Sequence, residues 1–361
     1  MYVKEIVLEN FRNYNEENLK FDKRGSFLCG RNGCGKTNLL ESVYILAYGK
    51  SFRTVNPEEM IMLSKDFFRI KGFFNGEYKK KIEFRFSKGI KKILINDVEI
   101  SSMKELIGNI ALILLTLNDI NLITGEPAMR RRFLNSLLSL LFHDYLVDLL
   151  DYRRVLRQRN KILYLKKIGK RNNTQGIDGW TDELIQIGSR IIEKRLSIMS
   201  DLNRSASFYY TLFTPQKDKF SIEYLPSFQI KENIEKCFRE SLSKGREKEL
   251  EKGITFTGPH RDELLITINE LPVRKFASEG EQRTCAISLK IAQASFLKSK
   301  RKDDPILLID EAVVELDRVR REKVLNSITD IGQCFIATTS CEKMDNMPSL
   351  KVIDIENEKS E

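Results

Sequence analysis

The stretch that decides the fold of this chain is Gly30-Arg31-Asn32-Gly33-Cys34-Gly35-Lys36-Thr37. It fits the pattern GxxxxGK[ST], and it stands between an apolar run at residues 26–29 and a helical pattern at residues 36–48. A strand before the pattern and a helix after it are the context that a phosphate-binding loop, or P-loop, requires. A glycine turn in front of a helix is the structural alternative, but the flanking segments favour the P-loop.

Each residue type in this loop has a chemical role in binding phosphate. Gly30 and Gly35 allow the backbone to wrap around phosphate, because glycine adopts conformations that other residues avoid. Backbone N–H groups and the N-terminus of the following helix attract the anion. Lys36 adds a positive charge to the β- and γ-phosphates, and Thr37 offers a hydroxyl to Mg²⁺. We therefore expect all eight residues to bind ATP, and Lys36 to assist catalysis as well.

A second half of the nucleotide site is predicted where the apolar run at residues 305–309 ends in Asp310 and Glu311. Ligands of an open α/β sheet collect at the carboxyl ends of its strands. We expect Asp310 to hold the Mg²⁺ shell and Glu311 to polarise the attacking water as a general base. An apolar strand ending in two acids is weak evidence by itself, but beside a P-loop it predicts ATP hydrolysis.

The block Ser278-Glu279-Gly280-Glu281-Gln282-Arg283 resembles the signature of ABC-type ATPases, and Glu315-Leu316-Asp317 resembles their D-loop. A serine that caps a helix N-terminus makes a second anion site on the same chain. In ABC-type ATPases this serine reaches the γ-phosphate that the partner subunit holds. The resemblance implies an ATP-dependent homodimer, in which Ser278, Gly280 and Gln282 complete the nucleotide site of the partner.

Hydrophobic patterning divides the chain into three parts. Short β-type runs broken by turn residues predict antiparallel strands at residues 67–100. Apolar residues at steps of three and four then predict helices between residues 127 and 202, with an interruption at Arg159 and a loop at residues 170–179. Strand and helix patterns return toward the C-terminus.

The P-loop and Asp310 lie far apart in the sequence but must meet in space, so both ends of the chain must build one domain. We predict an α/β fold in which an ABC-type ATPase head, with a mixed sheet and a P-loop, is split by a short helical arm. The head takes residues 1–125 plus 255–361, and the arm takes residues 126–254.

Positive charge is concentrated in the predicted arm. The chain has a formal net charge of +10, and residues 130–171 hold 12 Lys and Arg against 3 acids. Such an excess favours duplex DNA, contacted at its phosphates without base specificity; a solvated helix surface is the alternative. The candidate DNA-binding residues are Arg130, Arg131, Arg132, Arg153, Arg154, Arg157, Arg159 and Lys161.

The cysteine spacing and the hydropathy predict a cytoplasmic protein. The six cysteines form no CxxC pair and have no histidine partners at zinc spacing, so we expect reduced thiols. No apolar run approaches the roughly 20 residues of a membrane span. We expect no membrane partner.

Several blocks together resemble the RecF family, bacterial recombination mediators related to SMC proteins. They are residues 8–14 (LENFRNY), the P-loop, residues 51–53 (SFR), residues 125–134 (GEPAMRRRFL), residues 158–160 (QRN), residues 258–262 (GPHRD) and the signature. The GPHRD block and the arginine run before Phe133 are not general features of ABC-type ATPases. The resemblance therefore extends from the first strand to the D-loop.

The resemblance implies slow ATP hydrolysis that resets the dimer, and binding to duplex DNA, gapped junctions and single strands. It implies action in recombinational repair and replication restart at gaps, together with RecO and RecR in loading RecA. Arg12, by similarity to SMC heads, would contact a nucleotide phosphate; a surface arginine is the alternative. Thr338, Thr339 and Ser340 stand where many ABC proteins have a switch histidine, consistent with weak hydrolysis.

Two other functions are less compatible with these residues. An ATPase subunit of a membrane transporter normally has a compact head without such an arm. A structural protein with a relic nucleotide site would have a broken P-loop, whereas Lys36, Thr37, Asp310 and Glu311 are all present. His260 has no nucleophile nearby in the sequence and is predicted to be a structural loop residue.

Overall fold

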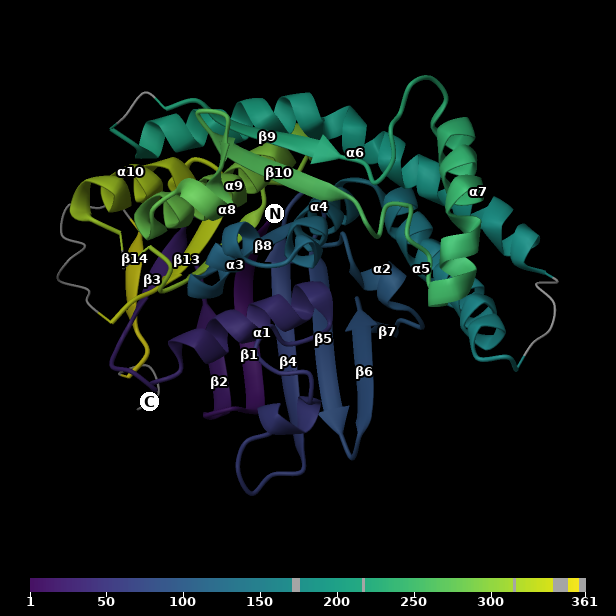
Figure 1. Ribbon diagram of the computed structural model, residues 1–361. Helices are drawn as coiled ribbons and strands as arrows, with labels where there is room; N and C mark the ends of the chain where they lie inside the picture. The colour runs from purple at the N-terminus through teal and green to yellow at the C-terminus, as the bar shows by residue number, and fades with distance from the viewer. Residues whose placement is uncertain (171–175, 216–217, 314–315, 340–349, 357–361) are drawn as a thin grey trace. The chain divides into compact units, whose positions relative to one another are not determined.

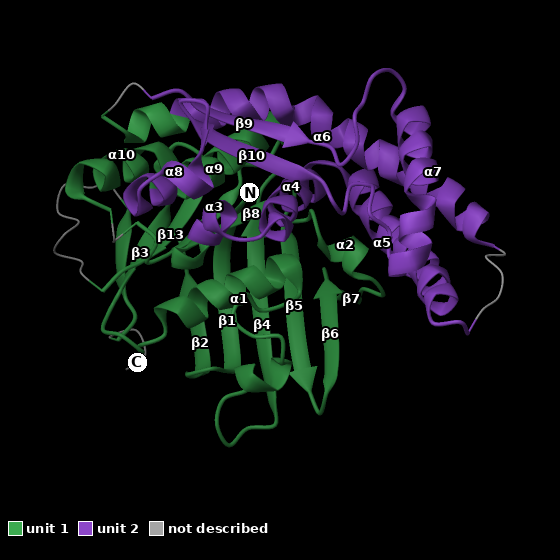
Figure 2. Ribbon diagram, in the orientation of Figure 1, with its two compact units in different colours: residues 1–119, 209–217, 284–361 green, residues 120–208, 218–283 purple. Residues whose placement is uncertain are grey.

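The computed structural model describes residues 1–170, 176–215, 218–313, 316–339 and 350–356. The chain forms two compact units, coloured separately in Figure 2. The first unit contains residues 1–119, 209–217 and 284–361, and the second contains residues 120–208 and 218–283. Both units are assembled from segments that are distant in the sequence.

The first unit contains an antiparallel sheet in the strand order β2-β1-β4-β5-β6-β7. Its strands are β1 (Tyr2–Phe11), β2 (Tyr14–Lys20), β4 (Phe67–Asn75), β5 (Lys80–Ser87), β6 (Ile90–Ile95) and β7 (Val98–Glu99). Buried and more exposed residues alternate along β4, so that one face of the strand is buried and the other is partly solvated. The expected antiparallel strands at residues 67–100 are therefore present.

A second sheet of the first unit is parallel, in the order β14-β3-β13-β12-β8. Its strands are β3 (Gly25–Cys29), β8 (Leu112–Thr116), β12 (Ile306–Asp310), β13 (Gln333–Ala337) and β14 (Lys351–Asp354). The central strands are apolar on both faces, as expected for a parallel sheet that is covered on both sides. Asp310 pairs in register with Thr116 of β8 and with Ala337 of β13.

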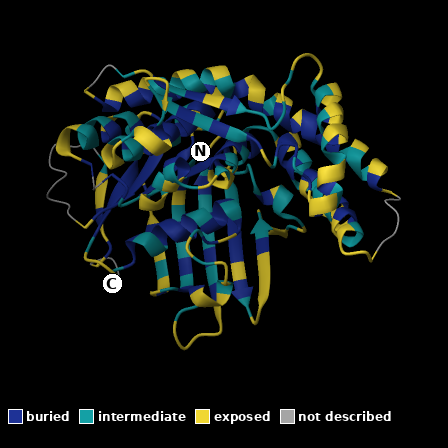
Figure 3. Ribbon diagram, viewed as in Figure 1, coloured by how far each residue is buried: buried dark blue, intermediate teal, exposed yellow. Residues whose placement is uncertain are grey.

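Helix α1 (Lys36–Tyr48) contacts strands of both sheets, namely β4 and β5 of the antiparallel sheet and β8, β12 and β13 of the parallel sheet (Figure 1). Most of its residues are buried, as Figure 3 shows. The main hydrophobic core, which includes Leu40, Phe68 and Leu308, lies around this helix. Because α1 begins inside the P-loop, the core fixes the position of the loop.

The remaining short elements of the first unit are η1 (Pro57–Met60), α2 (Met103–Leu106) and α10 (Arg318–Thr329). Element η2 (Leu117–Ile120) lies where the chain passes into the second unit, and α6 (Ile177–Phe213) and α9 (Glu279–Lys300) each have residues in both units.

The second unit contains helices and a three-stranded antiparallel sheet. Its other helices are α3 (Asn121–Thr124), α4 (Pro127–Leu141), α5 (His143–Lys167), α7 (Ile234–Lys252) and α8 (Val273–Phe276). The sheet has the order β11-β10-β9, from β9 (Phe220–Leu225), β10 (Glu263–Ile268) and β11 (Leu271–Pro272).

The expected interruption of the helical pattern at Arg159 is wrong. Helix α5 runs unbroken through this position, and Arg159 lies among its buried residues. Its guanidinium pairs with Glu249 of α7 at 2.6 Å. A charged residue can occupy an apolar helix face when a buried partner neutralises it. The expected loop at residues 170–179 is also shorter, since α6 begins at Ile177.

The units divide the chain at different places from those predicted. Strand β10 pairs along its full length with β9, and this pairing places residues 263–268 in the second unit. The segment 255–283, which the sequence predicts to be part of the head, belongs instead to the second unit. None of the described helices is both long and apolar enough to span a membrane.

Candidate nucleotide-binding site

The P-loop has the backbone conformation that its glycines predict. Gly30, Gly33 and Gly35 have φ angles of 139°, 85° and 123°, all in the region that favours glycine. A Cβ at position 30 would also lie 2.7 Å from the Cys34 sulfur. No described side chain caps the first turn of α1, whose N-cap is Gly35. Its first N–H groups are therefore suited to bind an anion.

The side chain of Lys36 curls over the loop. Its ammonium donates to the carbonyl oxygens of Gly30 at 2.6 Å and Arg31 at 2.8 Å, and the residue is only 5% exposed. The charge is therefore held at the mouth of the loop. Arg31 itself points away, with a side chain that is 91% exposed, and its N–H donates to Glu356 at 2.7 Å.

The two halves of the predicted site meet. The Thr37 hydroxyl donates to a carboxylate oxygen of Asp310 at 3.0 Å, across 273 residues of sequence. Burial raises the pKa of Asp310, while the Thr37 hydrogen bond opposes the rise and the neighbouring Glu311 adds to it. A hydroxyl and a carboxylate side by side are oxygen ligands of the kind that Mg²⁺ prefers.

Glu311 has a φ of 58°, in the left-handed region that a residue with a Cβ rarely adopts. Strain of this kind costs about 1–3 kcal/mol and is concentrated at functional sites. The turn directs the chain away from β12 immediately after Asp310. Of the D-loop residues, Glu315 lies outside the described residues, and Asp317 caps α10 by accepting from the N–H of Arg320.

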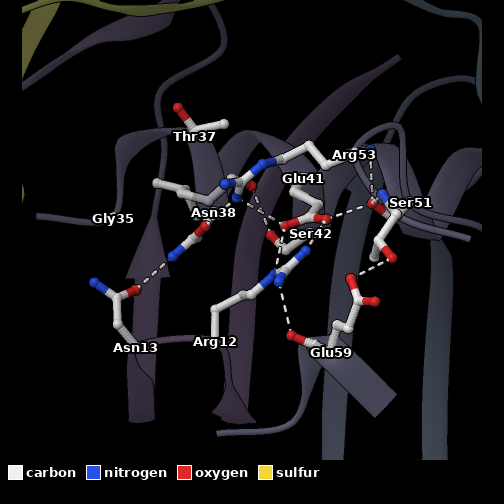
Figure 4. A network of polar contacts seen from close by, with 12 residues as sticks. Arg12, Asn13, Gly35, Thr37, Asn38, Glu41, Ser42, Ser51, Arg53 and Glu59 are labelled. Carbon is white, nitrogen blue, oxygen red and sulfur yellow. Dashed lines mark hydrogen bonds and ion pairs between the residues drawn. The ribbon is translucent and has the colours of Figure 1, made fainter. Parts of the chain in front are cut away.

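Arg12 lies beside α1, but Figure 4 shows its guanidinium engaged by protein groups. Nε and Nη2 donate to the two carboxylate oxygens of Glu41 at 2.9 and 2.8 Å, and Nη1 donates to the Glu59 carbonyl at 2.7 Å. Glu41 is fully buried and also accepts from Ser51 and Arg53. Arg12 therefore braces α1, and contact with a phosphate would require these bonds to rearrange.

In the second unit, Ser278 precedes α9 and closes a capping box. Its N–H and hydroxyl both donate to Glu281 at 2.7 Å, and the N–H of Glu281 points back to the Ser278 hydroxyl at 3.4 Å. Gln282 donates to the Ala277 carbonyl at 3.0 Å. The signature thus forms the helix start that the sequence predicted, with Gly280 in its first turn.

Comparison with known proteins agrees with this geometry. The family model for the RecF/RecN/SMC N-terminal domain matches residues 2–361. The protein from Bacillus cytotoxicus called "DNA replication and repair protein RecF" is 35% identical over 96% of this chain and 94% of its own length. A Bacillus thuringiensis protein of the same description is 34% identical over 99% and 97%. The chain belongs to the RecF family.

Solved structures support this assignment. A structure of "the recombination mediator protein RecF-ATPrS in RecFOR pathway" is similar with a TM-score of 0.87 and 30% identity, and the match covers 98% of this chain and 96% of that one. An SMC head bound to the C-winged helix domain of ScpA has a TM-score of 0.60 at 16% identity over 96% and 92% of the two chains, and shows a shared fold.

The arginines of this RecF-family chain are not equivalent. Arg130 is 5% exposed and forms an ion pair with Glu263 at 2.6 Å, and Arg159 is 2% exposed in its pair with Glu249. The prediction that these two arginines contact DNA is therefore wrong for this structure, because both guanidinium groups are buried in ion pairs. Arg130 would have to leave the partly exposed Glu263, and Arg159 would leave the buried Glu249 unpaired. Arg131 is half-buried and donates to the Asp262 carbonyl at 2.9 Å.

The other candidates are accessible. Arg132 of α4 and four residues of α5 have exposed side chains; the four are Arg153, Arg154, Arg157 and Lys161. Arg154 shares its charge with Glu183 at 2.8 Å. Their spacing along α5 places positive charge on one solvent-facing side of the helix.

The expectation that all six cysteines are reduced thiols is wrong for Cys29. Cys29, the last residue of β3, takes part in a disulfide bond. Cys34, Cys237, Cys285 and Cys334 do not take part in a disulfide bond. Thr338 is fully buried, and its N–H donates to the Leu28 carbonyl at 3.1 Å, whereas Ser340 lies outside the described residues.

Sequence reasoning missed the polar residues that support the P-loop. Asn13, Asn38, Glu41, Ser51 and Arg53 form a continuous set of hydrogen bonds beside α1 (Figure 4). The blocks LENFRNY and SFR held three of them, but no spacing rule indicated which side chains would meet.

Proposed function

We propose that this chain is an ATP-dependent DNA clamp, which dimerises on ATP and acts in recombinational repair and replication restart at single-strand gaps. The observation that carries the proposal is the hydrogen bond between Thr37 and Asp310. It joins a P-loop and an acidic strand end into one site, and such sites bind and hydrolyse nucleoside triphosphates.

The residues at this site fit a nucleotide with Mg²⁺. Thr37 and Asp310 would hold the metal ion, which stabilises negative charge on the phosphates when bound. Lys36 supplies positive charge from within the loop, and Glu311 lies next to Asp310 as the acceptor of a proton from the attacking water. Thr338 cannot take the place of a cationic switch histidine, which supports slow hydrolysis.

The signature at the start of α9 supports a composite site. Two copies joined head to head at their nucleotides would each present Ser278, Gly280 and Gln282 to the nucleotide of the other. The solved RecF with ATP and the one with ATPrS are relatives that hold a nucleotide, at 31% and 30% identity. We extend ATP binding to this chain on that basis.

The exposed basic side of α5, with Arg132, supports a DNA contact at phosphates. Arginine and lysine without base-specific partners favour affinity over sequence selectivity. RecO and RecR are the expected partners in loading RecA, because the similar solved proteins belong to the RecFOR pathway. Gapped junctions are the proposed substrate, and the proposed location is the cytoplasm.

The experiment that tests this function measures mass and DNA affinity together. Sedimentation velocity with and without ATP should show a dimer only with ATP. Fluorescence anisotropy should show tighter binding to gapped than to intact duplex, with ATP raising the affinity by roughly tenfold, a typical coupling between two sites. Lys36→Met should abolish both effects, because the loop loses its phosphate charge.

The matched control is Lys50→Met, since Lys50 is an exposed lysine just beyond α1. It removes the same charge outside the P-loop and should keep the ATP response of the parent protein. ATP-induced dimers in Lys36→Met would contradict the composite nucleotide site. Equal DNA affinity with and without ATP would contradict the clamp.

A further inference from the structure

Two neighbouring residues at the corner between β1 and β2 contact the P-loop, although no motif includes them in a nucleotide site. Asn13 donates from Nδ2 to the carbonyl of Cys34 at 2.9 Å and lies 3.4 Å from the carbonyl of Gly33. Tyr14 donates from its hydroxyl to the carbonyl of Gly35 at 3.1 Å, and this carbonyl also accepts from the N–H of Leu39 in α1 at 2.9 Å. Asn13 is exposed, whereas Tyr14 is 1% exposed.

These bonds determine the direction of N–H groups that they do not touch. A trans peptide is planar, so its C=O and N–H point in opposite directions. Holding the Cys34 carbonyl therefore orients the N–H of Gly35, and holding the Gly35 carbonyl orients the N–H of Lys36. Both N–H groups lie at the start of α1, where an anion binds.

The loop needs such support because the backbone of a glycine rotates freely about φ and ψ. Gly35 belongs to both supported peptides and Gly33 precedes them, and a Cβ at Gly33 would meet nothing within 4 Å. A side chain at this position would therefore have no neighbour to pack against. An unsupported peptide next to a glycine can turn over at low cost and direct a carbonyl toward the phosphate instead.

The Asn13 amide is itself held by a chain of hydrogen bonds, visible in Figure 4. Its Oδ1 accepts from Asn38 at 2.9 Å, and Asn38 accepts from Arg53 at 2.7 Å. Arg53 lies 3.4 Å from Glu41, whose carboxylate is fully buried. Each donor meets an acceptor along this chain, so the Asn13 NH₂ group must face the P-loop.

We propose that Asn13 and Tyr14 are positioning residues of the nucleotide site, which preorganise the peptides at Gly35 and Lys36 for the phosphates. The inference rests on the nucleotide site of the proposed function, but on neither dimerisation nor DNA. Preorganisation raises affinity because the loop need not be ordered when the ligand binds. Neither residue need touch the nucleotide.

The test uses Asn13→Ala and Tyr14→Phe in the full chain, at concentrations where the protein is monomeric. Calorimetry should show the dissociation constant of ADP rising roughly fivefold to tenfold in each variant, the equivalent of one lost hydrogen bond. Inorganic tripolyphosphate, measured by competition, should weaken by the same factor. In ATP hydrolysis KM should rise while kcat stays unchanged, because the support acts on ground state and transition state alike.

The controls are matched by chemistry. Tyr48→Phe removes a hydroxyl that donates to the Leu112 carbonyl at 2.6 Å, and Asn75→Ala removes an amide that donates to Tyr2 at 3.1 Å. Both lie in the same unit away from the P-loop and should keep parental nucleotide affinity at similar thermal stability.

Unchanged ADP affinity in Tyr14→Phe would overturn the inference, since this variant keeps the ring and its packing. A loss for ADP without a loss for tripolyphosphate would also overturn it, because Asn13 would then be contacting the nucleoside. A failure of ATP-induced dimerisation in the parent protein would contradict the proposed function and leave these affinities to be judged separately.

Discussion

At the scale of single residues, the chain uses one residue type for opposite purposes. Arg159 is buried and neutralised by Glu249, while Arg157, two positions earlier, is exposed on the same helix. The 3.6-residue period of α5 turns one toward the interior and the other toward solvent. A count of charges along the sequence treats both arginines alike. Only burial and the ion-pair partner show that Arg159 supports the fold, whereas Arg157 is available at the surface.

Among single residues, His260 shows how burial sets protonation. Its Nε2 faces the Thr255 carbonyl at 3.2 Å and its Nδ1 faces the Tyr152 hydroxyl at 2.8 Å, an arrangement that suits a neutral ring. Burial, aided by the charges of Arg261, Arg131 and Arg159, lowers its pKa from 6.5 to about 4, while the Thr255 carbonyl opposes the shift. The prediction of a structural role agrees with these contacts.

The free energy of unfolding should consequently depend on pH through His260. Because the pKa is lower in the folded protein, the unfolded chain binds the proton more readily. The stabilisation is complete above about pH 6.5 and is lost as the pH falls to about 4, by up to about 3 kcal/mol at 1.36 kcal/mol per unit. Urea unfolding across this range should show the slope in the parent protein.

The variant His260→Gln should be less stable at pH 7 but should lose this part of the slope. His143→Gln replaces the other histidine, which is exposed, and should keep the slope. An equal slope in His260→Gln and the parent would show that other groups carry the pH dependence.

At the scale of elements, the N-terminus of α9 combines a structural role with a proposed functional one. The capping box between Ser278 and Glu281 closes the helix within its own unit, and the same N-terminus is proposed to receive the nucleotide of a partner. The Glu281 carboxylate occupies the two donors of Ser278, so a phosphate would have to displace it.

Ser278→Arg should separate these two roles. We expect nucleotide binding by the monomer to persist, because the P-loop is untouched, while ATP-induced dimers disappear from sedimentation velocity. Loss of the cap should cost about 1 kcal/mol of stability. Ser299→Arg, an exposed change near the other end of α9, is the control and should still dimerise. If Ser278→Arg abolished monomer binding too, the serine would act within its own subunit.

Elements also explain which sequence expectations succeeded. The strand and helix around the P-loop were predictable, because α1 and β3 follow local patterns of burial. The unbroken course of α5 through Arg159 was not predictable, since the partner that neutralises this arginine, Glu249, stands 90 residues away. Strand β2, which lies against β1, carries exposed polar residues and gave little signal.

At the scale of the whole molecule, the net charge of +10 does not show which basic side chains can meet DNA, but the burial of each residue does. With Arg130 and Arg159 buried, the candidate DNA contacts reduce to exposed residues of α4 and α5. Neutralising Arg153, Arg154 and Arg157 to Gln should weaken DNA binding and flatten its salt dependence. The slope of log K against log salt should fall by up to about 3, at about 0.9 per phosphate contact.

The control for that experiment removes three charges from the first unit, through Lys4→Gln, Lys20→Gln and Lys23→Gln, all at exposed positions. It tests whether net charge alone accounts for binding. Equal losses in the two triple variants would refute a specific basic surface on α5.

The sequence by itself determined the P-loop, the acidic strand end and the family, because each depends on residues close together in the chain. A local backbone pattern needs no distant partner to be recognised. Only the tertiary structure decided that Thr37 meets Asp310, that Arg12 is held by Glu41, and that Asn13 and Tyr14 support the loop. Burial and hydrogen-bond partners arise from segments that folding brings together, and spacing along the chain does not record them.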